Sequence, residues 1–277
     1  MGRVGSWRAA RGKNNCGRVA RLSAIAALGG YALGGQAALA DPPKCPASPP
    51  VFAANGWKNT FASHGATPLH ILAIGSSSTL GVGASAPAFS YPARLAADLQ
   101  TIWNVKAEVR NAGIGGETAR ATVARLKAAL SAGGTDLVLW QVGTNDAVTG
   151  ADDSRFRATV NEGISAAQAA HVPIVLVDPQ YYPGIKDAAR YERYVEAIDE
   201  AGEDRHIAVF SRYAMMKAWE QRSDTELRGM LSSDHFHMGD RGYACLALAL
   251  ASSLEGAPPF VLSAHPEGVD EDDAKRL

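Results

Sequence analysis

The chain has 277 residues, of which 47% are hydrophobic and 20% charged, and its formal net charge is −1. This length and apolar content suit one medium-sized domain with a substantial core, and they exclude a disordered or low-complexity chain. Residues 1–40 hold six cationic side chains and no acidic one, so the remainder has 21 cationic against 28 acidic residues, a balance of about −7. An acidic domain has no electrostatic basis for binding nucleic acid.

Residues 1–40 have the three parts of a secretory signal peptide. A basic region precedes an apolar run over residues 22–33, and Ala38-Leu39-Ala40 places small residues where a signal peptidase reads them. The apolar run is too short and too rich in Gly and Ala for a membrane span. An uncleaved N-terminal anchor is the alternative. We predict cleavage and export, and hence a periplasmic or secreted protein without a stable membrane span.

Two cysteines remain after the predicted cleavage, because Cys16 lies in the signal segment. Cys45 and Cys245 stand near opposite ends of the mature chain, and in an oxidising compartment they could form a disulfide that closes a loop of about 200 residues. The alternative is two free thiols, with Cys245 buried in a helix. No CxxC pair or Cys/His spacing indicates zinc, so we expect no metal.

Strand and helix patterns alternate through the rest of the chain. Residues 41–65 predict an irregular lead-in, residues 66–256 a single domain, and residues 257–277 a polar, acidic tail that we expect to be mobile. Within the domain we predict strands over 70–74, 105–110, 136–142, 173–177 and 207–210, and helices over 91–103, 117–130, 154–170, 187–201 and 240–254. This alternation is typical of a parallel sheet covered on both faces, with ligands bound at the carboxyl ends of the strands.

The loop after the first predicted strand reads Gly75-Ser76-Ser77-Ser78-Thr79-Leu80-Gly81. A serine in such a loop becomes a nucleophile only when a base removes its proton. The same loop could cap a helix or cradle a phosphate, and taken alone it favours that interpretation.

The next two strands also end in loops with candidate hydrogen-bond donors. Glycines in the segment over residues 111–118, which reads NAGIGGET, can bring a backbone N–H close to a ligand. Asn145, in the segment GTND over residues 143–146, can add a side-chain amide. Such groups stabilise an oxyanion, although a plain turn and ordinary helix capping are the alternatives.

Asp234 and His237 stand three residues apart, directly before the last predicted helix. At this spacing a carboxylate can fix the tautomer of the imidazole and aim its other nitrogen at a serine. His235 and His237 with Asp234 could instead hold a metal, but no further cluster of ligands accompanies them. We expect His235 to point away from the cleft.

These four segments, in this order, resemble blocks I, II, III and V of the SGNH/GDSL hydrolase superfamily. Block I, usually GDSxTxG, is GSSSTLG here and places the nucleophile at Ser77, while NxGxxGxT places the oxyanion glycine at Gly116. GxND is intact and gives Asn145, and DxxH followed by GY gives Asp234 and His237. The resemblance spans about residues 70–253. It implies a flavodoxin-like three-layer α/β/α sandwich with a five-stranded parallel sheet.

The chain departs from the family pattern at Ser76, where block I has an acid. This position is not a member of the triad, so its replacement removes neither nucleophile nor base. A carboxylate there would brace the nucleophile turn, and Ser76 can still form local hydrogen bonds. We therefore predict a differently braced turn, which affects rate and substrate preference more than activity itself.

The resemblance implies a serine esterase that works through an acyl-enzyme without cofactor or metal. Ser77, His237 and Asp234 would form the triad, with oxyanion donors from the N–H groups of Ser77 and Gly116 and from Asn145. No long insertion separates the blocks, which argues against a lidded lipase, so we expect short-chain acyl esters such as O-acetyl groups on carbohydrate. Tyr181 and Tyr182, after the fourth predicted strand, are candidate substrate-binding residues, with loop packing as the alternative.

Three other functions fit part of the pattern. An O-acyltransferase would use the same triad but exclude water. A flavodoxin-like binder of FMN or phosphate would use the serine-rich loop and leave Asp234 and His237 without a role. A non-catalytic envelope binding module would keep the fold and bind a ligand without turning it over.

Overall fold

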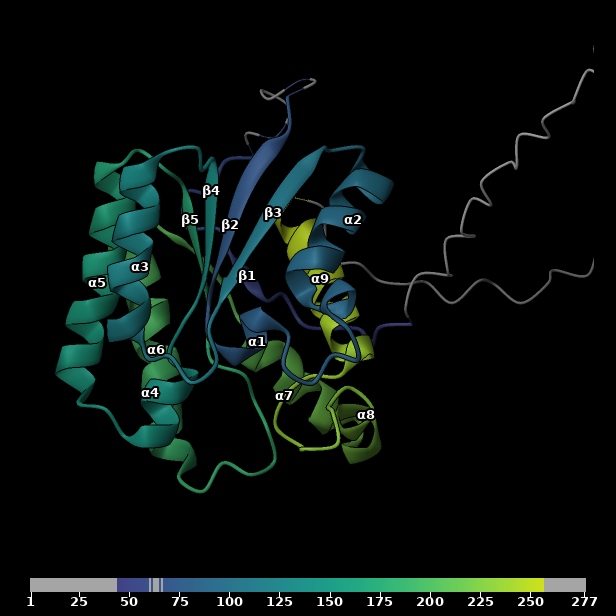
Figure 1. Cartoon of the computed structure of the whole chain (residues 1–277). Coiled ribbons are helices and arrows are strands. Elements are labelled where there is room, and N and C mark those ends of the chain that lie inside the picture. The colour runs from purple at the N-terminus through teal and green to yellow at the C-terminus, as the bar shows by residue number, and fades with distance from the viewer. Residues whose placement is uncertain (1–43, 60, 62–64, 66, 257–277) are drawn as a thin grey trace, which may run out of the picture. The chain divides into compact units, whose positions relative to one another are not determined.

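The computed structural model describes residues 44–59, 61, 65 and 67–256 (Figure 1). The predicted signal peptide and the predicted mobile tail lie outside these residues. The described chain forms a six-stranded sheet in the order β1-β6-β5-β4-β2-β3. Among its helices, none is both long and apolar enough to cross a membrane.

Five parallel strands confirm the predicted fold class. They are β2 (Leu69–Gly75), β3 (Ala107–Gly113), β4 (Leu137–Gln141), β5 (Ile174–Val177) and β6 (Ala208–Phe210). The sixth strand, β1 (Phe52–Ala53), pairs antiparallel with β6 and comes from the lead-in that we expected to be irregular. A strand of two residues is too short to show an alternating pattern, so it could not be predicted.

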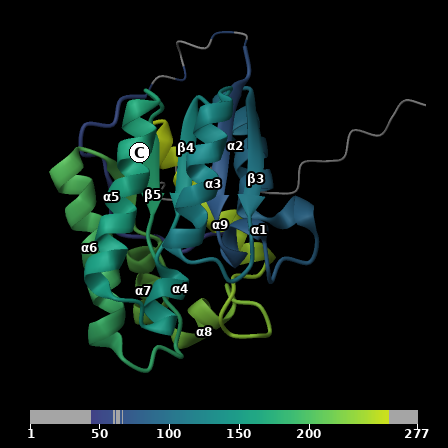
Figure 2. The same cartoon turned by 60° about the vertical axis from the view of Figure 1, so that its left-hand side comes forward.

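Helices cover both faces of the sheet, as Figures 1 and 2 show. One face carries α2 (Tyr91–Trp103), α7 (Arg212–Arg222) and α9 (Asp240–Leu254). The other carries α3 (Ala119–Ala132), α5 (Asp153–Ala169) and α6 (Ala188–Arg205). The three layers are therefore helix, sheet and helix, as in an α/β/α sandwich.

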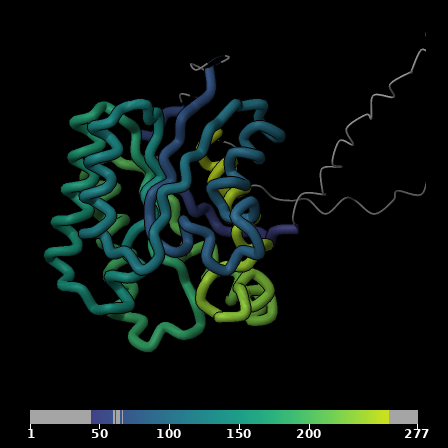
Figure 3. The backbone as a smooth tube through the Cα atoms, viewed as in Figure 1, coloured from purple at the N-terminus to yellow at the C-terminus, as the bar shows by residue number. Residues whose placement is uncertain are grey.

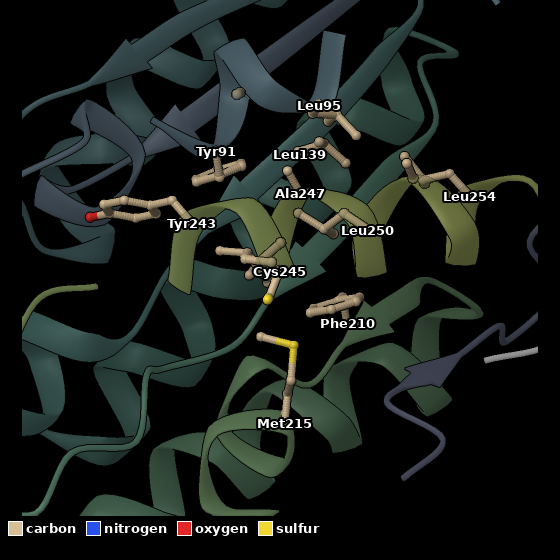
Figure 4. Close-up of a cluster of buried hydrophobic side chains, with 14 of the residues drawn as sticks. Tyr91, Leu95, Leu139, Phe210, Met215, Tyr243, Cys245, Ala247, Leu250 and Leu254 are labelled. Carbon is tan, nitrogen blue, oxygen red and sulfur yellow. The ribbon is translucent and has the colours of Figure 1, made fainter. Parts of the chain in front are cut away.

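The sheet separates two hydrophobic cores, and alternate residues of one strand enter different cores. Ile71 and Ala73 of β2 face the core that α2, α7 and α9 cover, whereas Leu72 and Ile74 face the other. Figure 4 shows part of the first core, where side chains of α2 and α9 meet those of the sheet and α7. Because both faces are buried, the strands read as continuous apolar runs, and each fully buried large side chain contributes roughly 1.5–3 kcal/mol.

Several short elements escaped the sequence analysis. They are α1 (Ser77–Leu80), the 3-10 helix η2 (Pro87–Phe89), α4 (Thr144–Thr149) and α8 (Asp224–Arg228). Each is shorter than two helical turns and shows no periodicity. The longer α7 was also missed, because it has no clean apolar stripe and buries a charged side chain, that of Arg212.

The sulfurs of Cys45 and Cys245 form a disulfide, with the two Cα atoms 5.5 Å apart. The bond ties the lead-in to α9 across 200 residues of sequence. Cys245 is buried within the core shown in Figure 4. By the chain-entropy argument, a bond that closes a loop of this length stabilises the fold by about 5 kcal/mol, the upper end of the range for disulfides.

The functional loops gather at the carboxyl edge of the sheet. The segments α1 and α4 directly follow β2 and β4, and they lie at the lower edge in Figure 1. The loop after α1 and the segment before α9 lie side by side there (Figure 3), and a side chain at Gly83 would collide with the carbonyl oxygen of Met238. The topology thus brings distant segments together where parallel sheets bind ligands.

Candidate active site

A chain of hydrogen bonds joins Asp234, His237 and Ser77. Nε2 of His237 lies 2.8 Å from Oγ of Ser77, which is 160 residues away in sequence. Nδ1 of His237 lies 2.6 Å from Oδ2 of Asp234. The structure therefore brings together the three side chains that the sequence analysis selected, in the order of a serine-hydrolase triad.

The carboxylate of Asp234 is held by several donors. Its Oδ1 accepts hydrogen bonds from the Ser232 hydroxyl at 2.7 Å and from the N–H groups of Phe236 and His237 at 2.9 and 2.8 Å. Partial burial would raise the pKa of Asp234, but the hydrogen bonds from His237, Phe236 and Ser232 outweigh it and hold the pKa well below its usual range. Asp234 is therefore ionised at neutral pH and favours a proton on Nδ1 of His237, which leaves Nε2 to accept the Ser77 proton.

Two glycines make the tight turn around Ser77 possible. A Cβ atom on Gly113 would lie 2.0 Å from the Leu80 nitrogen, and one on Gly75 would lie 2.5 Å from Oγ1 of Thr79. Neither position accepts a larger residue without displacing backbone or buried side chains. The ends of β2 and β3 therefore approach α1 closely, and this sets the direction in which Ser77 leaves the sheet.

Gln141 supplies the brace that the substituted acid of block I would otherwise give. Its Oε1 accepts from the N–H of Ser76 at 2.9 Å, from the Ser76 hydroxyl at 3.0 Å and from the Thr79 hydroxyl at 3.3 Å. All three residues are buried. Gln141 was not predicted from the sequence, although a polar residue at the end of the apolar run of β4 was a visible signal.

The candidate oxyanion residues lie close together, Gly116 in the turn before α3 and Asn145 in the first turn of α4. Gly116 has φ +79° in the turn between β3 and α3, and its N–H donates no hydrogen bond within the described residues. Nδ2 of Asn145 donates to the carbonyl oxygen of Glu117 at 2.7 Å, which joins Asn145 to the Gly116 turn. One hydrogen of the Asn145 amide remains, because the NH₂ group carries two.

The turn that holds Gly116 is anchored from both sides. Asp146 is buried and accepts from the N–H of Ala119 at 2.9 Å. Arg125 pairs with Glu117 and donates to the Ala112 carbonyl at 2.8 Å. These contacts fix the turn relative to β3 and α4, so its N–H groups are held in place before any ligand arrives.

The two candidate substrate-binding tyrosines lie in different environments. The ring of Tyr182 stands edge-on to that of Phe236 at 4.7 Å, and Phe236 stands edge-on to His237 at 4.8 Å. Tyr181 turns toward α7, where it packs on Tyr213 at 5.5 Å. Burial raises the pKa of Tyr181 to about 12, together with the Glu220 carboxylate, which accepts a hydrogen bond from the Tyr181 hydroxyl. Tyr182 is thus linked to His237 through the ring of Phe236, whereas Tyr181 packs against α7.

His235 is exposed, and its backbone is left-handed with φ +55°. Its side chain takes no part in the hydrogen bonds between Asp234, His237 and Ser77. Within the described part of the chain, no group of three or more His, Cys, Asp or Glu side chains has the arrangement of a metal site.

The role of Gln180 was also not predicted from the sequence. It is fully buried on the loop after β5, where it bonds to the residue after Ser77 and to the residue before His237. Both partners are far away in sequence, so no local pattern signalled its role.

The matching family model and the shared fold place the chain among the SGNH/GDSL hydrolases, which are carboxylic ester hydrolases. More narrowly, the chain belongs to the Non-GDSL lipase-like family, whose model matches residues 44–257. The name of this family agrees with the sequence of block I, in which Ser76 replaces the usual acid. Among curated proteins, none is significantly similar to this chain in sequence.

Several solved structures share the fold at low identity. A lipase/acylhydrolase from Enterococcus faecalis is 22% identical, with a TM-score of 0.58 over 69% of this chain and 98% of that one. The acetyl xylan esterase AlAXEase is 21% identical, with a TM-score of 0.59 over 67% of this chain and 99% of that one. A two-domain esterase, CEX, active on acetylated mannans, is 21% identical, with a TM-score of 0.55 over 68% of this chain and 49% of that one.

Proposed function

We propose that this protein is an exported serine esterase that hydrolyses short-chain acyl esters, with O-acetyl groups on carbohydrate as its substrates. The observation that carries the proposal is the continuous hydrogen-bond chain from Asp234 through His237 to Ser77. A binder of FMN or phosphate would have no use for this chain of groups.

In the proposed reaction, Nε2 of His237 takes the proton of the Ser77 hydroxyl as Oγ attacks the ester carbonyl carbon. The tetrahedral intermediate collapses, His237 gives its proton to the leaving alcohol, and the acyl group stays on Ser77. Water then attacks the acyl-enzyme while His237 takes its proton, and His237 returns this proton to Oγ of Ser77 as the carboxylic acid leaves. Asp234 stays ionised throughout and stabilises the imidazolium that forms twice in each cycle.

The oxyanion would bind three donors: the N–H groups of Ser77 and Gly116 and the side chain of Asn145. Ser77 is the first residue of α1, so its N–H has no partner within the helix. Asn145 retains one free amide hydrogen beside its bond to Glu117. A donor of this kind contributes roughly 2.7–4 kcal/mol to transition-state stabilisation.

One feature supports a carbohydrate ester as substrate. The fold is shared with an acetyl xylan esterase and with an esterase active on acetylated mannans.

The disulfide supports the proposed export. Cytosolic thiols are kept reduced, and a structural disulfide such as Cys45–Cys245 persists in an oxidising compartment. The signal-peptide pattern of residues 1–40 agrees with the same location.

The proposal is tested by Ser77→Ala on purified protein with p-nitrophenyl acetate. We expect kcat/KM to fall at least about 10³-fold, because the nucleophile and its base act as a unit. Ser165→Ala, on an exposed position of α5, is the matched control and keeps the parent rate. Equal turnover by Ser77→Ala and the parent would overturn the assignment.

The substrate is tested by p-nitrophenyl esters of graded acyl length and by acetylated xylan and peptidoglycan. We expect acetate esters to be preferred and acetate to be released from one of the polymers. A clear preference for octanoate, with no acetate released, would contradict the proposed substrate. An acyl acceptor that outcompetes water would reveal an O-acyltransferase.

A further inference from the structure

The side chain of Gln180 lies between the two segments that carry Ser77 and His237. Its Oε1 accepts a hydrogen bond from the Ser78 hydroxyl at 2.9 Å, and its Nε2 donates to the carbonyl oxygen of Phe236 at 2.8 Å. Ser78 follows Ser77 and Phe236 precedes His237, so one amide bonds to the neighbours of both.

We propose that Gln180 is a positioning residue that aligns the hydroxyl of Ser77 with Nε2 of His237. This inference rests on the esterase function proposed above. The aligned pair are 160 residues apart in sequence and only 2.8 Å apart in space. Their distance therefore depends on groups that hold the two segments against each other, and Gln180 does so from the buried side.

Gln180 is itself held firmly. Its N–H donates to Oγ1 of Thr144 at 3.3 Å, and its carbonyl accepts from the Tyr191 hydroxyl at 2.7 Å. Oγ1 of Thr144 also accepts from the fully buried Arg212 at 3.2 Å. These contacts fix the backbone of Gln180 to α4, α6 and α7, so its amide has a defined position from which to orient its partners.

Other contacts join the same two regions farther from the reacting atoms. Ser85 bonds to the carboxylate of Asp240 through its N–H at 2.8 Å and its hydroxyl at 2.5 Å. The Tyr243 hydroxyl donates to the carbonyl of Val82 at 2.6 Å. Because these bonds remain without Gln180, we expect its variants to fold while the loop around His237 shifts.

Only an amide fits both partners of this site. Ser78 offers a donor and Phe236 an acceptor, and an amide supplies the matching acceptor and donor. A carboxylate places an acceptor against the Phe236 carbonyl, and an alkyl group satisfies neither partner. Phe236 would then move to find another donor, and His237 would move with it. A displacement of about 1 Å at a reacting group can cost roughly 100-fold in rate.

The first test compares Gln180→Glu, Gln180→Leu and Ser78→Ala with the parent, using p-nitrophenyl acetate and a melting curve for each. We expect both Gln180 variants to lose at least tenfold in kcat with KM within about twofold. Ser78→Ala should lose less, because the bond to Phe236 remains. Gln100→Ala, exposed on α2, is the control and keeps the parent kcat. A parent-like kcat in Gln180→Glu would overturn the inference.

The second test separates positioning from a general loss of structure. In a His237→Ala background, Gln180→Glu should cause no further loss, because there is no imidazole left to align. The same fold-loss in both backgrounds would mean that Gln180 acts only through stability, and the inference would be wrong. Ser77→Ala distinguishes failure of the esterase proposal from failure of the Gln180 proposal. If Ser77→Ala abolishes turnover and Gln180→Glu leaves turnover unchanged, only the positioning role of Gln180 is wrong.

Discussion

The hydroxyl of Ser76 donates a hydrogen bond to Oε1 of Gln141 at 3.0 Å, and the N–H of Ser76 donates to the same oxygen at 2.9 Å. Ser76 occupies the place of the block I acid, so the brace of the nucleophile turn has changed from a carboxylate in the turn to an amide from the neighbouring strand. The turn is held without a buried charge at its base, and burial of an unpaired charge is far costlier than burial of a bonded amide.

Gln141→Leu should destabilise the protein and reduce its activity. The change leaves the two buried donors of Ser76 without their acceptor and removes one of the two hydrogen-bond partners of the Thr79 hydroxyl. We expect a loss of about 2–4 kcal/mol in the free energy of unfolding, measured by urea denaturation. Gln100→Leu, exposed on α2, is the control. A stability and kcat equal to the parent would show that the turn does not depend on this brace.

Asn145→Ala should lower kcat by roughly 10²–10³-fold with little change in KM, because an oxyanion donor acts on the transition state. Asn145→Asp has nearly the same shape but brings a negative charge toward the developing oxyanion, so its loss should be larger. Steady-state kinetics on p-nitrophenyl acetate measure both. Loss confined to KM would place Asn145 in substrate binding instead.

Asp234 should make folding stability sensitive to acid. Its pKa is lowered in the folded protein, so its contribution to stability is fully present above the unfolded pKa of about 3.9 and is lost as the pH falls through the folded pKa. The stability difference between the parent and Asp234→Asn should therefore be constant from pH 7 to 5 and shrink below about pH 4. Urea denaturation at each pH measures this. A difference that grows with acid would contradict the predicted sign.

Loss of the disulfide should reduce stability but not activity. Cys45→Ser should lower the free energy of unfolding by about 2–5 kcal/mol, because the unfolded chain regains the freedom of a loop of 200 residues. The bond joins the lead-in to α9, and neither cysteine contacts the triad, so kcat at 25 °C should match the parent. A reductant should lower the melting temperature of the parent and leave that of Cys45→Ser unchanged. An equal response of both proteins would argue against the bond.

Much of the fold could be predicted from the sequence because its signals were local, whereas the candidate triad rested on four segments that are ambiguous singly and resemble a family pattern together. The helix predicted over 91–103 was found with those bounds, since its apolar residues recur at helical spacing. The position of each candidate loop followed from the rule that parallel strands end at one edge of the sheet.

The supporting hydrogen bonds could not be predicted, because their partners are distant in sequence. Gln141 is 65 residues from Ser76, and Gln180 is 102 from Ser78 and 56 from Phe236. No periodicity or spacing records such pairs. The different surroundings of Tyr181 and Tyr182 could not be predicted for a related reason. Adjacent residues in an irregular loop can face opposite ways, and here Tyr181 packs against Tyr213 while Tyr182 packs against Phe236.

The central claim is that Ser77 is activated by His237, and labelling with a fluorophosphonate tests it most directly. The parent protein should gain one adduct by intact mass, peptide mapping should place it on Ser77, and hydrolysis of p-nitrophenyl acetate should fall in parallel with labelling. Ser77→Ala should not be labelled, and His237→Ala should be labelled at least about 10²-fold more slowly. An adduct on another residue, or full hydrolysis after complete labelling of Ser77, would contradict the account.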